Sequence, residues 1–377
     1  MEARQGCKAA QFPDRARELI KLLHALGKVV YRNLRMIDQI IHTTADIARA
    51  ARLSVAPMME WTDRHCRFFH RQMSSRALLY TEMVTSPALV RGGALHLLKY
   101  STVEHPVALQ LGGSDPAELA EAARIGAEHG YAEINLNVGC PSDRVQNGAF
   151  GAILMRDPKL VAECCAAMIK ASAVEVTVKC RIGVDDQTPS DVLPEFLARV
   201  AGAGVGRFTI HARKAWLQGL SPKENRDIPP LDYGLVQQMK GLFPALHLSL
   251  NGGITTLAQA QDALERGMDG VMIGRAAYHQ PADILMEADH MIYGAPKVER
   301  TREDIVMEML PYIDAHIAEG GKLGQVTRHM LGIFAGQPGA RYWKRHLSEN
   351  AHKHSSGSHT VVDAIEMMHA ARDNLTA

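Results

Sequence analysis

The strongest constraint on the fold of this 377-residue chain is a regular alternation of short apolar segments with segments of helical spacing. Strands are predicted at residues 53–58, 78–84, 107–111, 133–138, 174–180, 207–211, 246–250 and 270–273. Helices are predicted between them at 116–129, 158–172, 192–203 and 256–266. Such alternation is typical of parallel βαβ units. Eight units in roughly 240 residues match the length and count of a (β/α)8 TIM barrel.

The alternative arrangement of these units is an open, doubly wound sheet. A dinucleotide-binding sheet of that kind carries G-x-G-x-x-G after its first strand, and no such sequence follows residues 53–58. The strand–helix rhythm stops near residue 296, and helices are predicted at 301–319 and 360–373. We therefore expect a TIM barrel over residues 51–296, followed by a small all-helical domain over 297–377.

Residues 1–50 precede the periodic region and differ from it. Residues 17–34 can be drawn as a basic amphipathic helix, but the segment lacks the apolar core and the cleavage site of a targeting peptide. We interpret residues 1–50 as an N-terminal extension. It is either a disordered tail or the result of a start codon assigned too far upstream, with Met36 as an alternative start.

Composition excludes a membrane span and a cysteine-bound metal. The chain is 46% hydrophobic, but no run of ~18 apolar residues occurs in it. None of its six cysteines stands in a C-x-x-C pair, so neither zinc nor an iron–sulfur cluster is predicted. Scattered cysteines in a chain of this size are typical of reduced thiols, and we expect a cytoplasmic protein.

Residues typical of binding sites follow or end each predicted strand, and most of them are polar. In chain order they are Pro57-Met58-Met59, Glu82, Gln110, Asn137 with Cys140, Lys179 with Arg181, His211 with Arg213, Asn251-Gly252-Gly253 and Gly274-Arg275. A single one, such as His211, is readily explained as a structural residue. The carboxyl ends of all eight strands of a TIM barrel converge on one face, so together these residues predict an active site there.

The last two strand ends indicate a phosphorylated ligand. The segments 251–253 and 274–275 supply glycine-rich backbone N–H groups and one arginine. Barrels commonly hold a phosphate between the loops after strands seven and eight, although either glycine motif alone could merely close a turn. Lys179 could stabilise negative charge on a cofactor ring, and Gln110 could bond the edge of a heterocycle. The set fits flavin mononucleotide (FMN).

A cysteine stands at the end of the fourth predicted strand. Cys140 lies between Gly139 and Pro141, a position that is unusual for a core residue, and Arg144 and Asn147-Gly148 follow within a few residues. A thiol can act there as nucleophile, ligand or general acid, and the local sequence leaves these roles open.

Two basic segments suggest a polyanionic partner. The polar insertion at 216–233 and its flank contain Lys214, Lys223 and Arg226. Residues 322–353 contain six basic residues against Glu349, with an aromatic pair inside the patch: Lys322, Arg328, Arg341, Tyr342, Trp343, Lys344, Arg345 and Lys353. Basic residues interleaved with aromatics are what nucleic acid requires, whereas a solvated helical face is the alternative.

Several motifs in sequence order resemble the tRNA-dihydrouridine synthases, and the A-type branch in particular. They are S-V-A-P-M-M-E-W-T-D-R-H-C-R, L-Y-T-E-M-V-T, H-P-V-A-L-Q-L-G-G, E-I-N-L-N-V-G-C-P-S-D-R-V-Q-N-G, V-K-C-R-I-G, I-H-A-R-K-A-W-L-Q-G-L-S-P-K-E-N-R, S-L-N-G-G-I, D-G-V-M-I-G-R and G-Q-P-G-A-R-Y-W-K-R-H-L-S-E-N-A-H. The resemblance covers about residues 53–354 and leaves out residues 1–50. Cys180 and Glu60 depart from it, where the family often has Thr and Asp, and neither departure removes a residue that the chemistry needs.

The resemblance implies an FMN-containing barrel that reduces the C5–C6 double bond of uridines in the tRNA D-loop, at positions 20 and 20a, with NADPH. A hydride would pass from flavin N5 to C6, and Cys140 would give a proton to C5. A free thiol titrates near ~8.5 and is mostly protonated at neutral pH, and no adjacent base is evident to make a thiolate. The acid role therefore suits Cys140 better than the nucleophile role.

The resemblance also implies the roles of the other site residues. FMN would be held by Pro57, Met58, Met59, Gln110, Lys179, His211, Asn251, Gly252, Gly253, Gly274 and Arg275. The target uracil would contact Asn137 and Arg181, and the tRNA would contact Lys214, Lys223, Arg226, Arg328, Arg341 and Lys344. We expect a monomer that binds tRNA. The alternatives are a flavin barrel that reduces a small pyrimidine or enone, and an RNA-binding protein without catalysis.

Overall fold

The computed structural model describes residues 44–142 and 150–376, and eight parallel strands form a closed barrel in it. They pair in sequence order, and β1 closes the barrel against β8. The strands are β1 Leu53–Val55, β2 Leu78–Thr85, β3 Val107–Gly112, β4 Glu133–Val138, β5 Val176–Arg181, β6 Arg207–His211, β7 His247–Asn251 and β8 Gly270–Ile273. The predicted (β/α)8 barrel is confirmed.

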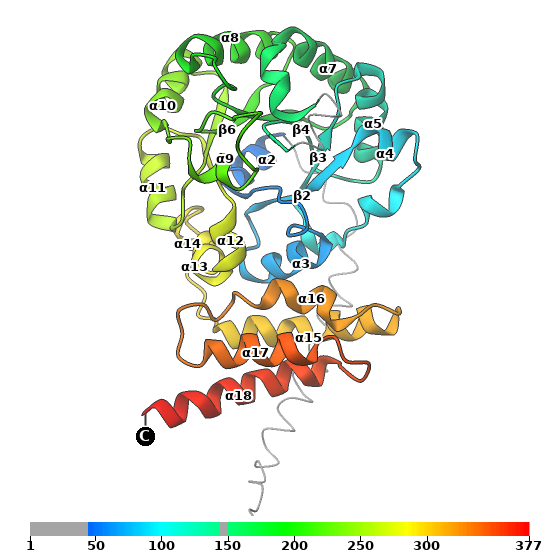
Figure 1. Ribbon diagram of the computed structural model, residues 1–377, viewed down its shortest axis with the longest axis vertical. Coiled ribbons are helices and arrows are strands. Elements are labelled where there is room, and N and C mark those ends of the chain that lie inside the picture. Colours follow the sequence, from blue (N-terminus) through cyan, green and yellow to red (C-terminus); the bar gives the residue numbers. More distant parts are fainter. Residues whose placement is uncertain (1–43, 143–149, 377) are drawn as a thin grey trace, which may run out of the picture.

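Helices surround the strands (Figure 1). The longer ones are α5 Pro116–Glu128, α7 Pro158–Ala171, α8 Pro189–Gly202, α10 Tyr233–Leu242 and α11 Leu257–Glu265. Their starts are encoded locally, because Asp115, Asp157 and Asp232 each accept a backbone N–H of the first turn. Shorter helices complete the barrel region: α4 Ser86–Val90, α9 Glu224–Asp227, α12 Arg275–His279, α13 Pro281–Leu285, α14 Ala288–Met291 and the 3-10 helices Leu95–Leu98, Thr102–Glu104 and Gly151–Arg156.

The first predicted strand is too long at its carboxyl end. The strand β1 ends at Val55, and the backbone N–H groups of Trp61 and Thr62 both donate to the carbonyl of Met58, at 3.1 and 3.0 Å. This turn, rather than a continued strand, places Pro57 and Met58. The predicted start of the fifth strand at residue 174 is also wrong, because β5 begins at Val176.

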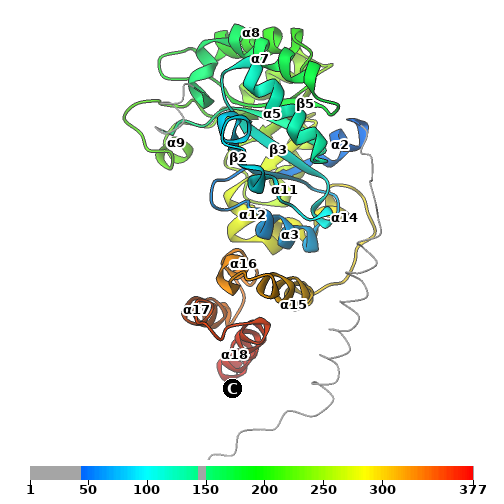
Figure 2. The same ribbon diagram turned by 90° about the vertical axis from the view of Figure 1, so that its right-hand side faces the viewer.

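The amino-terminal end of the barrel is covered by a short helix. Helix α2, Thr44–Ala50, buries Ile47 and Ala50 against the barrel interior near Tyr80 and Met272. Figure 2 shows α2 on the opposite side of the barrel from α9. Residues 44–50, which we assigned to the N-terminal extension, thus pack on the barrel. The basic helix predicted at 17–34 lies outside the described residues.

A buried ion-pair network fills the amino-terminal half of the barrel interior. Arg207 Nη2 lies 2.8 Å from Glu133 Oε2 and 2.7 Å from Glu175 Oε2. The Tyr80 hydroxyl donates to Glu133 Oε1 at 2.8 Å. Burial opposes the charge of the guanidinium, but the two carboxylates outweigh burial and raise the pKa of Arg207. The charge of Arg207 is therefore compensated by two carboxylates inside the protein, although its buried Nε forms no hydrogen bond with any described residue.

Four helices follow the barrel: α15 Arg302–Ala318, α16 Leu323–Met330, α17 Ala340–Asn350 and α18 Ser358–Thr376. All four lie below the barrel in Figure 1, and α15 and α16 are beside α3, Arg64–Met73. The rings of Phe68 and Tyr312 stack with centroids 3.9 Å apart, and Arg328 Nη2 lies 2.5 Å from Asp63 Oδ2. The predicted helices at 301–319 and 360–373 are confirmed, whereas α16 and α17 were not predicted as helices.

Candidate active site at the barrel mouth

We call the carboxyl ends of the strands and the loops that follow them the barrel mouth. Cys140 lies there in a turn that the side chain of Asn137 holds. Asn137 Oδ1 accepts the backbone N–H groups of Gly139 and Cys140, both at 3.0 Å. The half-buried Cys140 Sγ lies 3.4 Å from Ser142 Oγ. In residues 44–142 and 150–376 no carboxylate or imidazole hydrogen-bonds to this thiol, so none of the described residues is placed to act as its base.

The predicted substrate and cofactor amides are linked to each other. Asn137 Nδ2 donates to Gln110 Oε1 at 2.8 Å, and Gln110 Nε2 donates to Asn135 Oδ1 at 2.9 Å. These bonds fix the rotamers of both amides on neighbouring strands β3 and β4. Each amide nitrogen carries two hydrogens and uses one of them here, so both can still donate to a heterocycle. Their predicted ligand roles stay predictions.

Lys179 is a buried cation held by an amide. Its Nζ donates to Asn251 Oδ1 at 3.1 Å, and Asn251 Nδ2 donates to the carbonyl of Met272 at 2.8 Å. Burial and the nearby Arg181 lower the pKa of Lys179 to about 8. No carboxylate among the described residues forms an ion pair with its ammonium group. A site of this kind favours a ligand with negative charge or strong acceptors.

Arg181 connects the turn at residues 137–140, which carries Cys140 and is called the thiol turn, with the loop after β6. Its Nε donates to the carbonyl of Gly139 at 3.1 Å, and its Nη1 donates to that of Asn225 at 3.0 Å. Burial lowers the pKa of Arg181 to about 10. Its Nη2 forms no hydrogen bond within the described part of the chain. One edge of this guanidinium therefore remains available beside Cys140.

His211 and the glycines after β7 lie in contact. Gly252 and Gly253 have φ values of +112° and +70°, which side-chain-bearing residues rarely adopt. A Cβ on Gly252 would come within 2.6 Å of His211 Cδ2. Burial first, then Arg181 and Lys179, lowers the pKa of His211 well below its usual value, so its imidazole is neutral. The absence of side chains on these glycines lets the backbone of the loop pack directly against an uncharged ring.

The loops after β1 and β8 meet at the barrel mouth. A Cβ on Gly274 would lie 3.7 Å from Met58 Sδ. Met59 is exposed, and Pro57 and Met58 are half-buried. Arg275, predicted to bind phosphate, has its Nη2 2.7 Å from Asp227 Oδ1. That ion pair partly neutralises the arginine, so its role at a phosphate stays a prediction.

The predicted tRNA contacts fall into two groups. Lys214, Lys223 and Arg226 lie in the loop between β6 and α10, which contains α9. Arg328, Arg341 and Lys344 are exposed residues of α16 and α17. Figures 1 and 2 show α9 and α17 on the same side of the molecule. Arg328 differs from the others because its guanidinium pairs with Asp63.

Asn225 was not identified from the sequence as a site residue. It is fully buried, and its Nδ2 donates to the carbonyls of Trp216, Leu220 and Ser221 at 2.8, 3.1 and 3.3 Å. A polar residue in a polar insertion carries no signal of burial, so only the folded loop identifies it. Residues 143–149, which contain Arg144 and Asn147-Gly148, lie outside the described residues.

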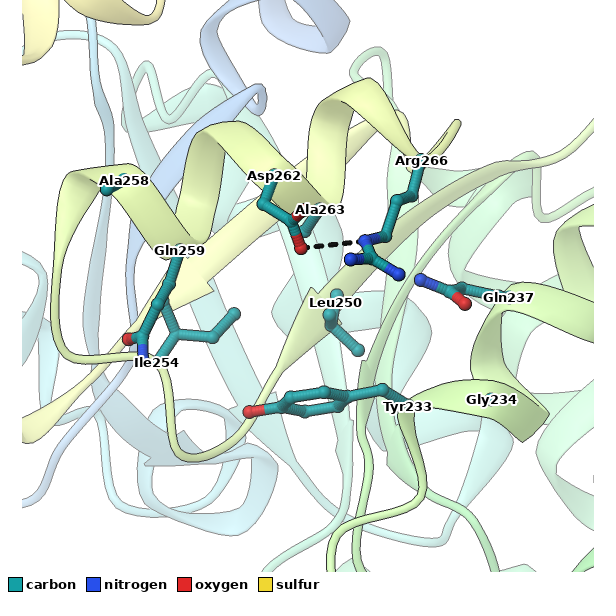
Figure 3. A pocket seen from close by; sticks show the side chains of 10 residues that line it. All are labelled: Tyr233, Gly234, Gln237, Leu250, Ile254, Ala258, Gln259, Asp262, Ala263 and Arg266. Carbon is teal, nitrogen blue, oxygen red and sulfur yellow. Dashed lines mark hydrogen bonds and ion pairs between the residues drawn. The ribbon is translucent and has the colours of Figure 1, made fainter.

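A cavity of about 650 Å³ lies between α10 and α11, outside the barrel mouth (Figure 3). Tyr233, Leu250 and Arg266 are among its lining residues, and Arg266 is paired with Asp262. The Tyr233 hydroxyl donates to the carbonyl of Gly252, so a residue of the cavity wall helps to hold the loop at residues 252–253. No group of three or more metal-ligating side chains, and no helix suited to cross a membrane, was found among the described residues.

Comparisons with known proteins match this arrangement to one family. The profile of the dihydrouridine synthase family matches residues 54–371. Curated proteins named tRNA-dihydrouridine(20/20a) synthase are similar over most of their length. The protein of Shewanella oneidensis is 57% identical over 83% of this chain and 92% of its own, and that of Vibrio cholerae is 55% identical over 85% and 97%. The Escherichia coli K12 protein is 53% identical over 86% and 93%.

Among solved structures, an old yellow enzyme homologue from Zymomonas mobilis aligns with a TM-score of 0.48 at 14% identity, over 67% of this chain and 92% of that chain. The family is shown by the profile, which spans residues 54–371, and by the curated relatives, which match 83 to 86% of this chain. This chain belongs to the dihydrouridine synthase family.

Proposed function

We propose that this enzyme reduces the C5–C6 double bond of uridines in the D-loop of tRNA, at positions 20 and 20a. Relatives at 53 to 57% identity carry the name of that activity. The structural observation behind the proposal is the Cys140 thiol, which has no base partner among the described residues and lies beside the buried cations Lys179 and Arg181. A proton donor next to an anion-accepting pocket suits the reduction of an enone-like ring.

The residues of the barrel mouth fit FMN. The left-handed backbone at Gly252 and Gly253 lets main-chain N–H groups approach a phosphate closely. The ammonium group of Lys179 is bound to a neutral amide and can accept negative charge from a ring. The residues that would hold the cofactor are Pro57, Met58, Met59, Gln110, Lys179, His211, Asn251, Gly252, Gly253, Gly274 and Arg275.

When bound and reduced by NADPH, FMN would supply the hydride that C6 of uracil receives. As that hydride arrives, C5 acquires carbanion character and takes the proton of the Cys140 thiol, so the S–H bond breaks and a C5–H bond forms. Arg181 and Lys179 stabilise the thiolate that remains until solvent returns a proton. Arg181 Nη2, which forms no hydrogen bond to the described residues, and the second amide hydrogen of Asn137 donate to the uracil carbonyls.

The target uridine must leave its place in the folded D-loop, which costs a few kcal/mol of lost stacking. Phosphate contacts from Lys214, Lys223 and Arg226 in the loop, and from Arg328, Arg341 and Lys344 in the helical region, offset this cost. RNA of this kind is recognised by shape and unstacked bases. We propose that the protein acts in the cytoplasm as a monomer.

The substitution Cys140→Ala tests the chemical assignment. Bound flavin and its reduction by NADPH should persist, both followed by absorbance. Dihydrouridine formation on unmodified tRNA, measured by mass spectrometry, should fall about 10²- to 10⁴-fold because a positioned acid contributes that much. Cys164→Ala, at a buried thiol on α7, serves as the control and should leave the rate unchanged. Wild-type turnover in Cys140→Ala contradicts the acid role.

The substrate is tested separately with the wild-type protein. Mass spectrometry of tRNA from a deletion strain should show uridine in place of dihydrouridine at positions 20 and 20a, restored by the cloned gene. In vitro, free uridine should be a poor substrate compared with tRNA, because it forms none of the phosphate contacts. Equal rates on free pyrimidines and tRNA would instead support a reductase of small molecules.

A further inference from the structure

Trp216 is an exposed ring on a rigid backbone. Its side chain is 41% exposed, although tryptophan usually buries most of its surface. Both backbone groups of Trp216 are held by one residue: its N–H donates to Asn225 Oδ1 at 2.7 Å, and its carbonyl accepts from Asn225 Nδ2 at 2.8 Å. Because Asn225 is fully buried, the exposure of the ring does not come from a loose loop.

The residues on both sides of Trp216 are anchored as well. Ala215 forms a parallel bridge with Val184 and exchanges backbone hydrogen bonds with Gly183 and Asp185, at 3.0 and 2.8 Å. The N–H of Leu217 donates to Asp185 Oδ1 at 2.7 Å. The loop after β6 is thus fastened to the loop after β5, and this fastening presents the indole ring to solvent.

The segment that holds the Trp216 ring is connected through Arg181 to the turn that carries Cys140. Arg181 donates to the carbonyl of Gly139, next to Cys140, and also to the carbonyls of Lys214 and Asn225, at 3.3 and 3.0 Å. One guanidinium therefore connects the thiol turn with both ends of the segment that holds Trp216. Figure 2 shows the loop with α9 projecting from the barrel on the side where α17 lies.

The charges around the ring match a polyanion that carries aromatic bases. Lys214 Nζ lies 5.2 Å from the Trp216 ring centroid. Within the described residues Lys214, Lys223 and Arg226 form no ion pair with a carboxylate. By contrast, Asp185 pairs with Arg156, and Asp227 with Arg275, both at 2.7 Å. Uncompensated cations beside an exposed indole are the elements with which proteins bind unpaired nucleotides.

We propose that Trp216 stacks on a nucleobase of the tRNA D-loop that neighbours the target uridine, while Lys214 covers the other face of the indole and meets the adjacent phosphate. This inference rests on the proposed function and adds a residue to it. Stacking tolerates any base, so Trp216 holds the unstacked loop open without reading its sequence. Asn225 acts as the positioning residue that keeps the ring in place.

The test compares Trp216→Ala with Trp216→Phe in the flavin-loaded full-length protein. Dihydrouridine formation is measured on a tRNA transcript and on two transcripts that lack the base on the 5′ or the 3′ side of the target uridine. On intact tRNA, Trp216→Ala should lower kcat/KM about 5- to 150-fold, the usual range for one lost stacking contact. Trp216→Phe should recover most of that loss. Flavin content and NADPH oxidation should match the wild type in both variants.

The transcripts without a base separate stacking from a structural role. On one of them the wild type should lose activity, and Trp216→Ala should cause little further loss, because the stacking partner is already gone. An equal loss by Trp216→Ala on all three transcripts, or no loss on intact tRNA, overturns the proposal. If the wild type forms no dihydrouridine on any tRNA, the proposed function fails instead, and the two failures are distinguishable.

Fluorescence supplies a second measurement that does not depend on turnover. Trp343 is fully buried and Trp61 is half-buried, so Trp216 is the most exposed of the three tryptophans of the chain. Binding of tRNA should quench the wild-type emission, and most of this quenching should disappear in Trp216→Phe. Leu242→Ala, at a 62% exposed position at the end of α10, is the control and should change neither kcat/KM nor quenching. Unchanged quenching in Trp216→Phe contradicts the proposal.

Discussion

The barrel buries cations at both of its ends. At the amino-terminal end the cation pairs with carboxylates, whereas at the barrel mouth the cations bind uncharged oxygens. At the amino-terminal end, Arg207 lies between Glu133 and Glu175, and its pKa is raised. At the barrel mouth, Lys179 and Arg181 bind amide and carbonyl oxygens, and burial lowers their pKa values to about 8 and about 10. A paired buried charge stabilises a fold, whereas one without a counter-ion indicates a place for a ligand.

Removal of a carboxylate at the amino-terminal end should have the largest effect. Glu133→Ala leaves Arg207 with a single partner and takes an acceptor from Tyr80. Loss of one partner from a buried pair usually costs about 3–5 kcal/mol, so the free energy of unfolding in urea should fall by that amount. Arg199→Ala on α8, at an exposed ion pair, is the control and should change it by less than about 1 kcal/mol. If Glu133→Ala and Arg199→Ala lower the free energy of unfolding by similar amounts, the buried ion pair stabilises the fold no more than an exposed pair.

Removal of the cation at the barrel mouth should weaken flavin binding without lowering the stability of the apoprotein. Lys179→Met keeps most of the length of the side chain and removes a buried charge that no carboxylate of the described residues compensates. The apoprotein should unfold at the same or a higher urea concentration. Flavin affinity should fall by about 1.5–3 kcal/mol, the usual contribution of a hydrogen bond from a charged group. Titration with FMN measures this loss, and a destabilised apoprotein with normal flavin affinity would show that Lys179 is structural.

The lowered pKa of Lys179 should also make the stability of the apoprotein depend on pH. The pKa of Lys179 is about 8 in the folded protein and ~10.4 in an unfolded chain, so the unfolded state binds more protons between these values. The stability of the wild-type apoprotein relative to Lys179→Met should therefore rise with pH across this window, by at most ~1.4 kcal/mol per pH unit. Unfolding curves from pH 7 to 10 check this. A difference that stays constant with pH contradicts the lowered pKa.

Exposed cations of the helical region form a third class, for which the smallest effect on stability is expected. Lys344 is exposed on α17 and forms no ion pair among the described residues. Lys344→Ala should change the free energy of unfolding by less than about 0.5 kcal/mol. It should lower the slope of log affinity for tRNA against log salt by about 1, as expected for one lost phosphate contact. Glu366→Ala, on α18, should leave the slope unchanged. An unchanged slope in Lys344→Ala would show that Lys344 does not contact a phosphate of the tRNA.

Much of the barrel and part of its mouth follow from local sequence. The strand from 133 to 138 and the helix caps Asp115 and Asp157 are set by neighbouring residues, and the eightfold alternation then brings the strand ends to one face. This logic predicted that Cys140, Lys179 and Arg181 share a site, and the structure joins the turn before Cys140 to Arg181 by one hydrogen bond.

Contacts between residues far apart in the chain could not be predicted in this way. Arg275 was expected at a phosphate, yet it pairs with Asp227, 48 positions away. Arg328 was grouped with the exposed cations of the tail, yet it lies against Asp63 at the start of α3. A charged residue has the same sequence signature whether its partner is a ligand, solvent or a distant carboxylate, so only the folded chain tells these cases apart.

The sequence by itself determined the strand–helix order, the closed barrel and the identity of the groups at its mouth, because these depend on periodicity and on residues close in the chain. The tertiary structure decided which buried cations are compensated, since Arg207 meets two carboxylates and Lys179 meets an amide. It also decided that Asn225 is buried and that Trp216 is held outward. Burial and pairing depend on what the other strands and loops bring close, and that is settled only when the barrel closes.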